Sequence, residues 1–250
     1  MRNKSAPFLL PLFLIFFSCQ SINSNITKVG IPPQAVYFSF DDGPNAHDDT
    51  TERLLDALGK YQIRALFFLL GENAERYPEL VRRIYAEGHY IANHGYSDKH
   101  TCAMSDDEFR NNLLRGEAAI SSVLGFEMNP KLYRPQGGIF NSGQEKICID
   151  EGYVIIPVTV RVYDAVANAA ERKRIVNKTV SLVIKGNGGL ILLHDGRDSY
   201  SRKEAELERN PNGAFNRSWI PGAVEEIITS LLDRGYNLNG PDILSVIISE

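Results

Sequence analysis

Polar side chains that could do chemistry stand directly after several short apolar runs. An aspartate pair, Asp41-Asp42, follows one run and His94 ends another. The other residues of this kind are Arg134, Asp164 and His194. Carboxylates and imidazoles serve as general acids, general bases and ligands of divalent cations. An isolated aspartate pair could instead cap a helix, and an isolated histidine could be a buried core residue.

The elements that would position these residues alternate along the chain. Strands are expected over 35–40, 65–70, 89–93, 132–134, 153–160 and 190–194, from their short apolar runs. Helices are expected over 50–60, 77–87, 105–124, 142–151, 171–184 and 223–234, from their apolar periodicity. Ser105 with Glu108 forms a capping-box pattern at the start of the long third helix. The polar stretch 200–219 lacks periodicity and is expected to be a long loop above the site.

Alternating strands and helices predict a mostly parallel sheet covered by helices. Six or seven such units favour a single-domain α/β barrel that is somewhat short of eight regular units. In parallel barrels the carboxyl ends of the strands meet at one face, where chemistry collects. The polar residues at the strand ends are therefore expected to converge on one site.

The composition of the 250 residues supports a globular protein and excludes some partners. An apolar content of 43% is enough for a substantial core. The formal net charge is −4, from 27 basic and 31 acidic residues, and no basic run stands out. We therefore expect no nucleic-acid binding.

The first residues read as a targeting segment. Arg2 and Lys4 precede an apolar run over 8–17, which is too short to span a bilayer. Ser18-Cys19 then resembles a bacterial lipoprotein cleavage site, at which Cys19 would be lipidated. The alternative is ordinary signal-peptide cleavage nearby. We expect a signal segment over 1–19, a tether over 20–34, a catalytic domain over 35–250, and an exported protein of the cell envelope anchored by lipid. Whether Cys102 and Cys148 form a disulfide stays open.

Several motifs also resemble those of a known family. The runs are Ser39–Pro44 (SFDDGP), Gly88–His94 (GHYIANH), Arg134–Gly138 (RPQGG) and Leu192–Asp195 (LLHD). In this order they resemble the NodB-homology polysaccharide deacetylases, carbohydrate esterase family 4, over about residues 35 to 240. The resemblance implies a distorted (β/α)7-type barrel, in agreement with the count of units.

The resemblance also implies roles for individual residues. Asp42 and His94 would be ligands of a divalent metal ion, and Asp41 would be the general base. Arg134 would orient that base, and the backbone N–H of Gly137 would help to hold the oxyanion. A histidine titrates near working pH, so His194 would be the general acid.

Asp164 is the best candidate to hold His194 in its protonated form. The metal would be zinc, with cobalt or manganese as alternatives.

Several positions depart from the family pattern. A second metal-binding histidine is usual four residues after the first, where this chain has Asp98. Asp98 could ligate in its place, His100 could reach the metal instead, or the metal site could be lost. Gln136 and Gly137 replace a proline and an aromatic residue.

In a fourth motif the family's aspartate and tryptophan correspond roughly to Arg161 and Ala165. Apolar packing around an acetyl methyl would then come from Leu193, Ile139 or Trp219.

The resemblance implies a metal-dependent hydrolase that removes N-acetyl groups from polysaccharide containing N-acetylglucosamine, such as peptidoglycan or chitin-like material. Two alternatives stay open: an esterase that removes O-acetyl groups from xylan-type polymers, and a catalytically weak glycan-binding lipoprotein. We expect a monomer.

Overall fold

The computed structural model describes residues 20–21, 30–198 and 200–247. The expected signal segment and Cys19 lie outside these residues. Within the described part of the chain, no helix is both long and apolar enough to cross a membrane.

Seven parallel strands form one sheet in the order β7-β5-β4-β3-β2-β9-β8. In chain order they are β2 (Val36–Gly43), β3 (Ala65–Leu69), β4 (Tyr90–Asn93), β5 (Leu132–Tyr133), β7 (Val154–Ile155), β8 (Val160–Arg161) and β9 (Gly189–His194). The central strands β3, β2 and β9 are almost wholly buried, as expected for a parallel sheet with both faces covered. The sheet curls into a barrel that stays open between its edge strands β7 and β8. This confirms the single-domain, (β/α)7-type architecture.

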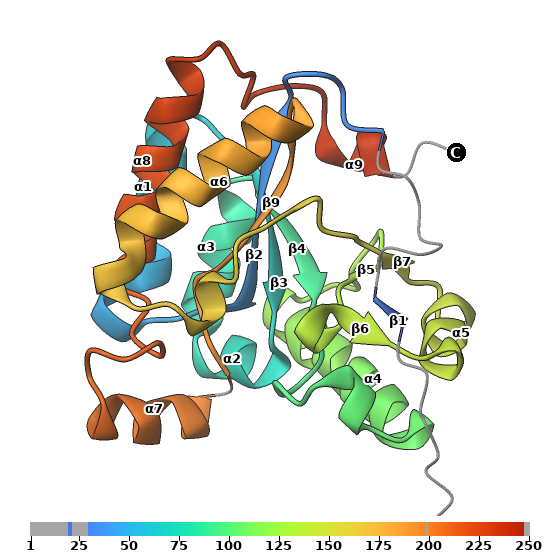
Figure 1. The fold of residues 1–250 in the computed structure, drawn as a ribbon. Coiled ribbons are helices and arrows are strands. Elements are labelled where there is room, and N and C mark those ends of the chain that lie inside the picture. The colour runs from blue at the N-terminus through green and yellow to red at the C-terminus, as the bar shows by residue number, and fades with distance from the viewer. Residues whose placement is uncertain (1–19, 22–29, 199, 248–250) are drawn as a thin grey trace, which may run out of the picture.

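The helices divide into two groups around this sheet. α1 (Thr50–Lys60), α6 (Arg172–Gly186) and α8 (Ile220–Leu232) pack together on one side (Figure 1). α2 (Gly71–Arg76), α3 (Pro78–Ala86), α4 (Asp106–Leu124) and α5 (Ser142–Asp150) follow one another over the other side. The face of α1 that carries Leu54, Leu55 and Leu58 is fully buried in the main core cluster, where each leucine contributes about 2 kcal/mol. The expected bounds of α1 and the capping box between Ser105 and Glu108 are confirmed.

One expected strand, 153–160, is in fact two strands at opposite edges of the sheet. β7 pairs with β5, whereas β8 pairs with β9. Pro157 lies between them and lacks a backbone N–H for a sheet hydrogen bond. The chain therefore leaves one edge and joins the other, which gives the barrel its open side.

The segment 200–219 was wrongly expected to be a long loop. Its first half is α7 (Tyr200–Arg209). Most of this helix is polar, so it carries too few apolar residues for a helical period to show in the sequence. Its inner face nevertheless buries Leu207 and the whole of Lys203, whose Nζ donates to Asn45 Oδ1 at 3.1 Å.

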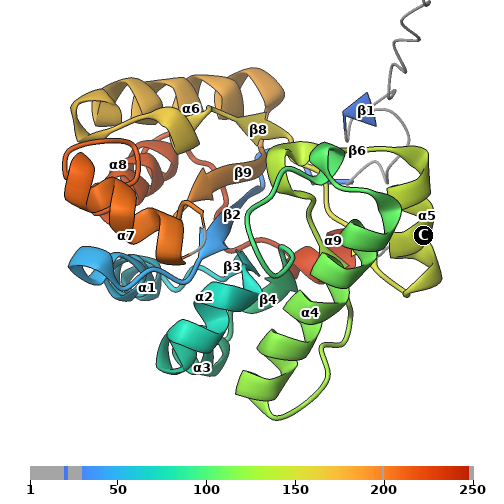
Figure 2. The ribbon, with the colours of Figure 1, turned by 90° about the horizontal axis from the view of Figure 1, so that it is seen from below.

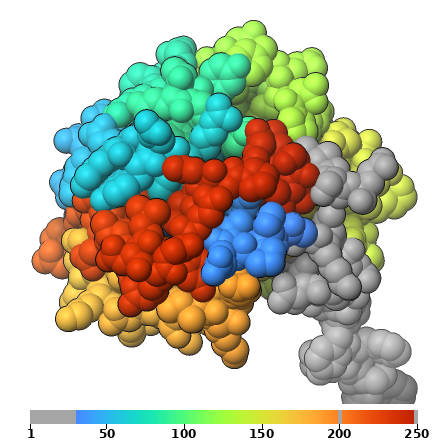
Figure 3. Space-filling model, turned by 90° about the horizontal axis from the view of Figure 1, so that it is seen from above, coloured from blue at the N-terminus to red at the C-terminus, as the bar shows by residue number. Residues whose placement is uncertain are grey.

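Short elements that were not expected from the sequence include α2, β1 (Gln20–Ser21), β6 (Ile139–Phe140) and α9 (Ile243–Ile247). β1 and β6 pair antiparallel. Near the amino ends of the barrel strands, the residues before β2 lie beside the C-terminal segment, with a parallel bridge between Ala35 and Asn237 (Figure 3). Cys148 is a buried free thiol, so it does not pair with Cys102.

Candidate active site

One pocket at the carboxyl ends of the barrel strands collects every site residue expected from the sequence. Figure 2 views the molecule from this side, with β2 ending near the centre. The lining includes Asp41, Asp42, His94, Asp98, His100, Arg134, Gly137, Asp164 and His194. Residues more than 150 positions apart in the chain therefore share one cavity, and their roles can be considered together.

Asp41 lies near the carboxyl end of β2 and is held by Arg134. Arg134 Nη1 donates to Asp41 Oδ1 at 2.6 Å and to Ser39 Oγ at 3.0 Å. The guanidinium also lies over the ring of Phe68, with 3.9 Å between Cζ and the ring centre. Both charged side chains are almost fully buried, so the ion pair is protected from water. The guanidinium therefore fixes the position of the Asp41 carboxyl in an apolar setting, as a positioned base requires.

Asp42 and His94 face each other beside that pair. His94 Nδ1 lies 2.7 Å from the carbonyl oxygen of Arg134, which only an N–H at that position can satisfy. Nε2 therefore carries the lone pair in the neutral ring, and it lies 3.3 Å from Asp42 Oδ1. Burial alone would raise the pKa of Asp42, but contact with His94, when Nε2 also carries a proton, and the charge of His194 lower it. The two side chains thus present a nitrogen and a carboxylate oxygen to one point.

The backbone at Asp42 is in the left-handed region, with φ 68°. Asn73 Nδ2 donates to the Asp42 carbonyl oxygen at 2.8 Å and holds this conformation. Gly196 packs so closely against the same carbonyl that a Cβ there would overlap it. The strained aspartate is therefore fixed by contacts from α2 and from the loop after β9.

Asp98 and His100 both line the pocket, but they differ in burial. Asp98 is half-buried, and burial together with the charge of Asp42 raises the pKa of Asp98 to about 7. His100 is exposed, and its ring lies against Gly137. Among the described residues, no group of three or more His, Cys, Asp or Glu side chains stands ready-made for a metal ion. The structure thus brings Asp42 and His94 together as a pair, with Asp98 as a neighbouring third carboxylate.

His194 and Asp164 form the opposite wall of the pocket. Asp164 Oδ1 lies 2.9 Å from His194 Nδ1, and Asp164 Oδ2 accepts the His194 backbone N–H at 2.8 Å. Burial alone would lower the pKa of His194, but the charge and hydrogen bond of Asp164 raise it to about 9. His194 is therefore protonated at neutral pH, with its Nε2 side towards the pocket.

Arg217 lies behind this wall and could not be identified from the sequence. Its Nη2 donates to Asp164 Oδ2 at 2.6 Å, and its Nε donates to the His194 carbonyl oxygen at 3.1 Å. It is fully buried. A single arginine in a polar stretch carries no local signal, so only the fold reveals it.

The apolar wall of the pocket differs from what the sequence suggested. Leu192 lines the pocket, whereas Leu193 points into the main core cluster, because neighbouring residues of a strand face opposite ways. Trp219 is also in that core cluster and is only 5% exposed, so it is a packing residue. Ile139 is not among the lining residues, whereas Ala165 is.

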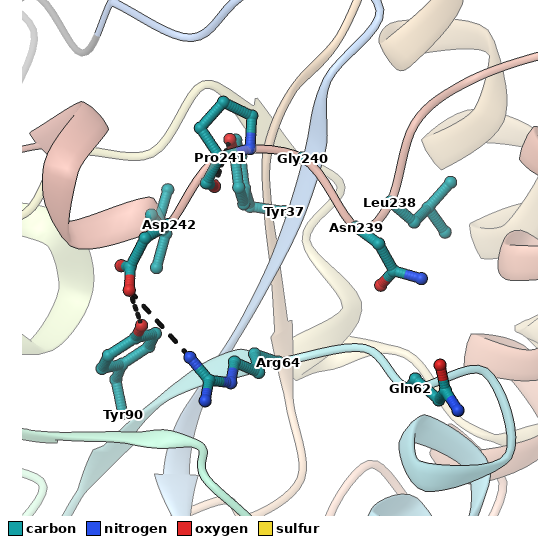
Figure 4. A pocket seen from close by; sticks show the side chains of 10 residues that line it. Tyr37, Gln62, Arg64, Tyr90, Leu238, Asn239, Gly240, Pro241 and Asp242 are labelled. Atoms are coloured by element: carbon teal, nitrogen blue, oxygen red, sulfur yellow. Dashed lines mark hydrogen bonds and ion pairs between the residues drawn. The ribbon is translucent and has the colours of Figure 1, made fainter.

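A second hollow lies at the opposite, amino-terminal end of the strands (Figure 4). Its polar groups bind one another: Tyr37 Oη donates to the Pro241 carbonyl oxygen at 2.9 Å, and Tyr90 Oη donates to Asp242 Oδ2 at 2.5 Å. No histidine lines it. It therefore lacks the acid–base groups that the carboxyl-terminal pocket has.

Comparisons with known proteins agree with this geometry. Residues 28–156 match the family model described as polysaccharide deacetylase. A peptidoglycan-N-acetylglucosamine deacetylase of Bacillus cereus is 35% identical over 162 residues, which are 64% of this chain and 55% of that protein. A chitooligosaccharide deacetylase of a Bradyrhizobium species is 29% identical, over 82% of this chain and 88% of that protein.

Solved structures show the same fold. The crystal structure of a peptidoglycan N-acetylglucosamine deacetylase in complex with a hydroxybenzamide compound has a TM-score of 0.65 and 30% identity, covering 83% of this chain and 86% of that one. A family 4 acetyl xylan esterase from Clostridium thermocellum, in complex with a cobalt ion, has a TM-score of 0.60 and 26% identity, covering 81% and 86%. The family model matches more than half of the chain, and the chain therefore belongs to the polysaccharide deacetylase family.

Proposed function

We propose that this protein is a metal-dependent hydrolase that removes N-acetyl groups from polysaccharide containing N-acetylglucosamine, such as peptidoglycan or chitin-like material. One observation carries the proposal above all. The pocket has the Asp41 carboxyl, held by Arg134, on one wall and His194, whose pKa Asp164 raises to about 9, on the other. Amide hydrolysis needs both a base for water and an acid for the leaving nitrogen.

The donor set fits a divalent cation. Asp42 and His94 would hold it, with Asp98 as the third ligand, because Asp98 lies in the same pocket and its charge is otherwise repelled by Asp42. His100 is less suited, since it is exposed and packs against Gly137. When bound, such a cation lowers the pKa of water and polarises a carbonyl oxygen. Zinc suits a histidine with carboxylates, and cobalt or manganese are the alternatives.

The chain's own residues would then divide the proton transfers. Asp41 takes a proton from the attacking water, and Arg134 holds Asp41 in place for this. The backbone N–H of Gly137 stabilises the oxyanion of the tetrahedral intermediate. His194 gives its proton to the leaving amine, so the products are acetate and a free amino sugar.

Acetate release from N-acetylglucosamine oligomers tests the proposal. We expect release that a chelator abolishes and that added zinc or cobalt restores. Acetylated xylan is the second substrate in the same assay, because the similar structure with cobalt is an acetyl xylan esterase. Release from xylan alone would favour O-acetyl esterase activity. Binding of the oligomers without release under any metal would show a glycan-binding protein and contradict the proposal.

We further propose that the protein is exported and anchored to the cell envelope by lipid on Cys19, as a monomer. The support is the basic start, the short apolar run and Ser18-Cys19 in the sequence. Mass spectrometry of the mature N-terminus would show a diacylglyceryl-cysteine. An unmodified start after Cys19 would instead show ordinary secretion, and light scattering would report the oligomeric state.

A further inference from the structure

The charges in the active-site pocket are not evenly paired. Arg134 is matched by Asp41, and the buried Arg217 behind the pocket is matched by Asp164. Two further arginines line the pocket, Arg161 and Arg197. Neither has a carboxylate within ion-pair distance among residues 30–198 and 200–247. The pocket therefore carries two cations that form no ion pair with a carboxylate in the described part of the protein.

Arg161 stands on the Arg134 side. It ends β8, where it is in register with the pocket residue Leu192 of β9. Its guanidinium packs against the backbone of Gly138 so closely that a Cβ on that glycine would overlap it. Arg161 is half-buried in this position. Partial burial of an uncompensated charge is unfavourable, so an anion from a ligand would be stabilised there.

Arg197 stands on the His194 side, three residues after that histidine. The ring of Phe215 lies under its guanidinium, with 4.4 Å between Cζ and the ring centre. Stacking of this kind fixes the plane of the guanidinium and leaves its edge, which carries the N–H donors, available. This arginine is half-buried as well. An edge of N–H donors in one plane matches the two oxygens of a carboxylate.

The aspartates that line the pocket restrict where an anion could bind. Asp41, Asp42 and Asp98 line the same pocket and would repel an anionic group placed among them. The acetyl group to be hydrolysed is neutral and can lie there. An anion on the substrate is instead favoured next to Arg161 and Arg197, the two lining cations that have no ion-pair partner among the described residues.

From this arrangement we propose that Arg161 and Arg197 select an acidic glycan, in which a carboxylate is carried close to the N-acetyl group. The inference rests on the proposed deacetylase function and names the class of polymer that the site prefers. A neutral homopolymer leaves both arginines without a counter-charge. A carboxylate-bearing polymer supplies one at the rim without disturbing the neutral acetyl group at the centre.

A matched pair of substrates tests the proposal. The first is a soluble glycan of alternating N-acetylglucosamine and N-acetylmuramic acid with free lactyl carboxylates. The second is the same glycan with those carboxylates converted to methylamides. We expect wild-type kcat/KM for acetate release to be about tenfold higher on the free acid, and this ratio to fall as salt is added.

The protein variants are Arg161→Gln, Arg197→Gln and both together. We expect the double variant to bring the ratio close to one. Arg82→Gln is the matched control, because Arg82 is exposed on α3 and does not line the pocket, so the ratio should stay at its wild-type value. Equal rates of the wild type on both substrates, or an unchanged ratio in the double variant, would overturn the proposal.

Calorimetric binding of both glycans to the wild type in chelator gives a readout that needs no turnover. Preference for the free acid without any acetate release would support the anion site and contradict the deacetylase function. Acetate release with no preference for the free acid in either assay would support the deacetylase function and contradict the anion site. The two failures are therefore distinguishable.

Discussion

The two ends of the barrel use polar side chains in opposite ways. At the amino-terminal end, the hydroxyls of Tyr37 and Tyr90 bind acceptors in the C-terminal segment, and these contacts hold that segment to the sheet. At the carboxyl-terminal end, charged groups are buried but keep unused capacity: Arg134 Nη2, for example, has no hydrogen-bond partner. Buried groups that stay unsatisfied require an explanation, and a bound substrate provides one. The comparison indicates that one end stabilises the fold and the other performs the chemistry.

The largest expected effect is that of Asp41→Asn. Asparagine keeps the shape but is no base, so acetate release should fall roughly 1,000-fold. Steady-state kinetics on N-acetylglucosamine oligomers measures this, with circular dichroism to check the fold. A loss below tenfold would show that Asp41 is not the base and would remove the main contrast between the two ends.

Asp164→Asn should lower kcat by roughly 100-fold and change its pH dependence. Asp164 raises the pKa of His194 to about 9, so the acid form is present below that pH and is lost as pH rises through it. A bound cation opposes protonation, so the alkaline limb of kcat should lie at or below that value. Removal of the carboxylate should move the limb to lower pH. An alkaline limb at the wild-type position in the variant would contradict the role of Asp164.

Asp98→Asn should weaken metal binding about 10- to 100-fold, because a carboxylate ligand is replaced by a neutral amide. Calorimetric titration with zinc measures the affinity. His100→Ala is the control and should bind zinc as the wild type does. The reverse outcome would assign the third ligand to His100.

The smallest effect is expected at the amino-terminal end. Tyr90→Phe removes the hydroxyl that binds Asp242 and should cost about 1 kcal/mol of unfolding free energy. Acetate release should not change. Urea denaturation and the acetate assay together measure both quantities, and a large loss of activity would mean that the two ends are coupled.

The parts of the fold that could be predicted have strong local signals. α1 has three leucines on one face, and α4 begins with a capping box, so both follow from spacing within a single helix. α7 could not be predicted in this way, since its few apolar residues form no clear period. The division of 153–160 into β7 and β8 could not be predicted from neighbouring residues either. The two strands lie on either side of Pro157 and pair at opposite edges of the sheet.

The site shows the same division. Asp41, Asp42, His94 and His194 could be named because each ends an apolar run that reads as a strand. Arg217 follows no such run, although it binds both Asp164 and the His194 carbonyl. Trp219 could be named as a sugar platform or as a core residue, and only packing places it in the core.

The amino-acid sequence by itself determined the order of strands and helices and the chemical types at the strand ends, because both depend on residues close together in the chain. The tertiary structure decided which of those side chains meet, which arginine supports His194, and which charges stay unpaired in the pocket. Such contacts join residues more than 150 positions apart, as between Asp41 and His194, which are in register on β2 and β9. They depend on strand pairing and on the curl of the whole sheet, which no local pattern specifies.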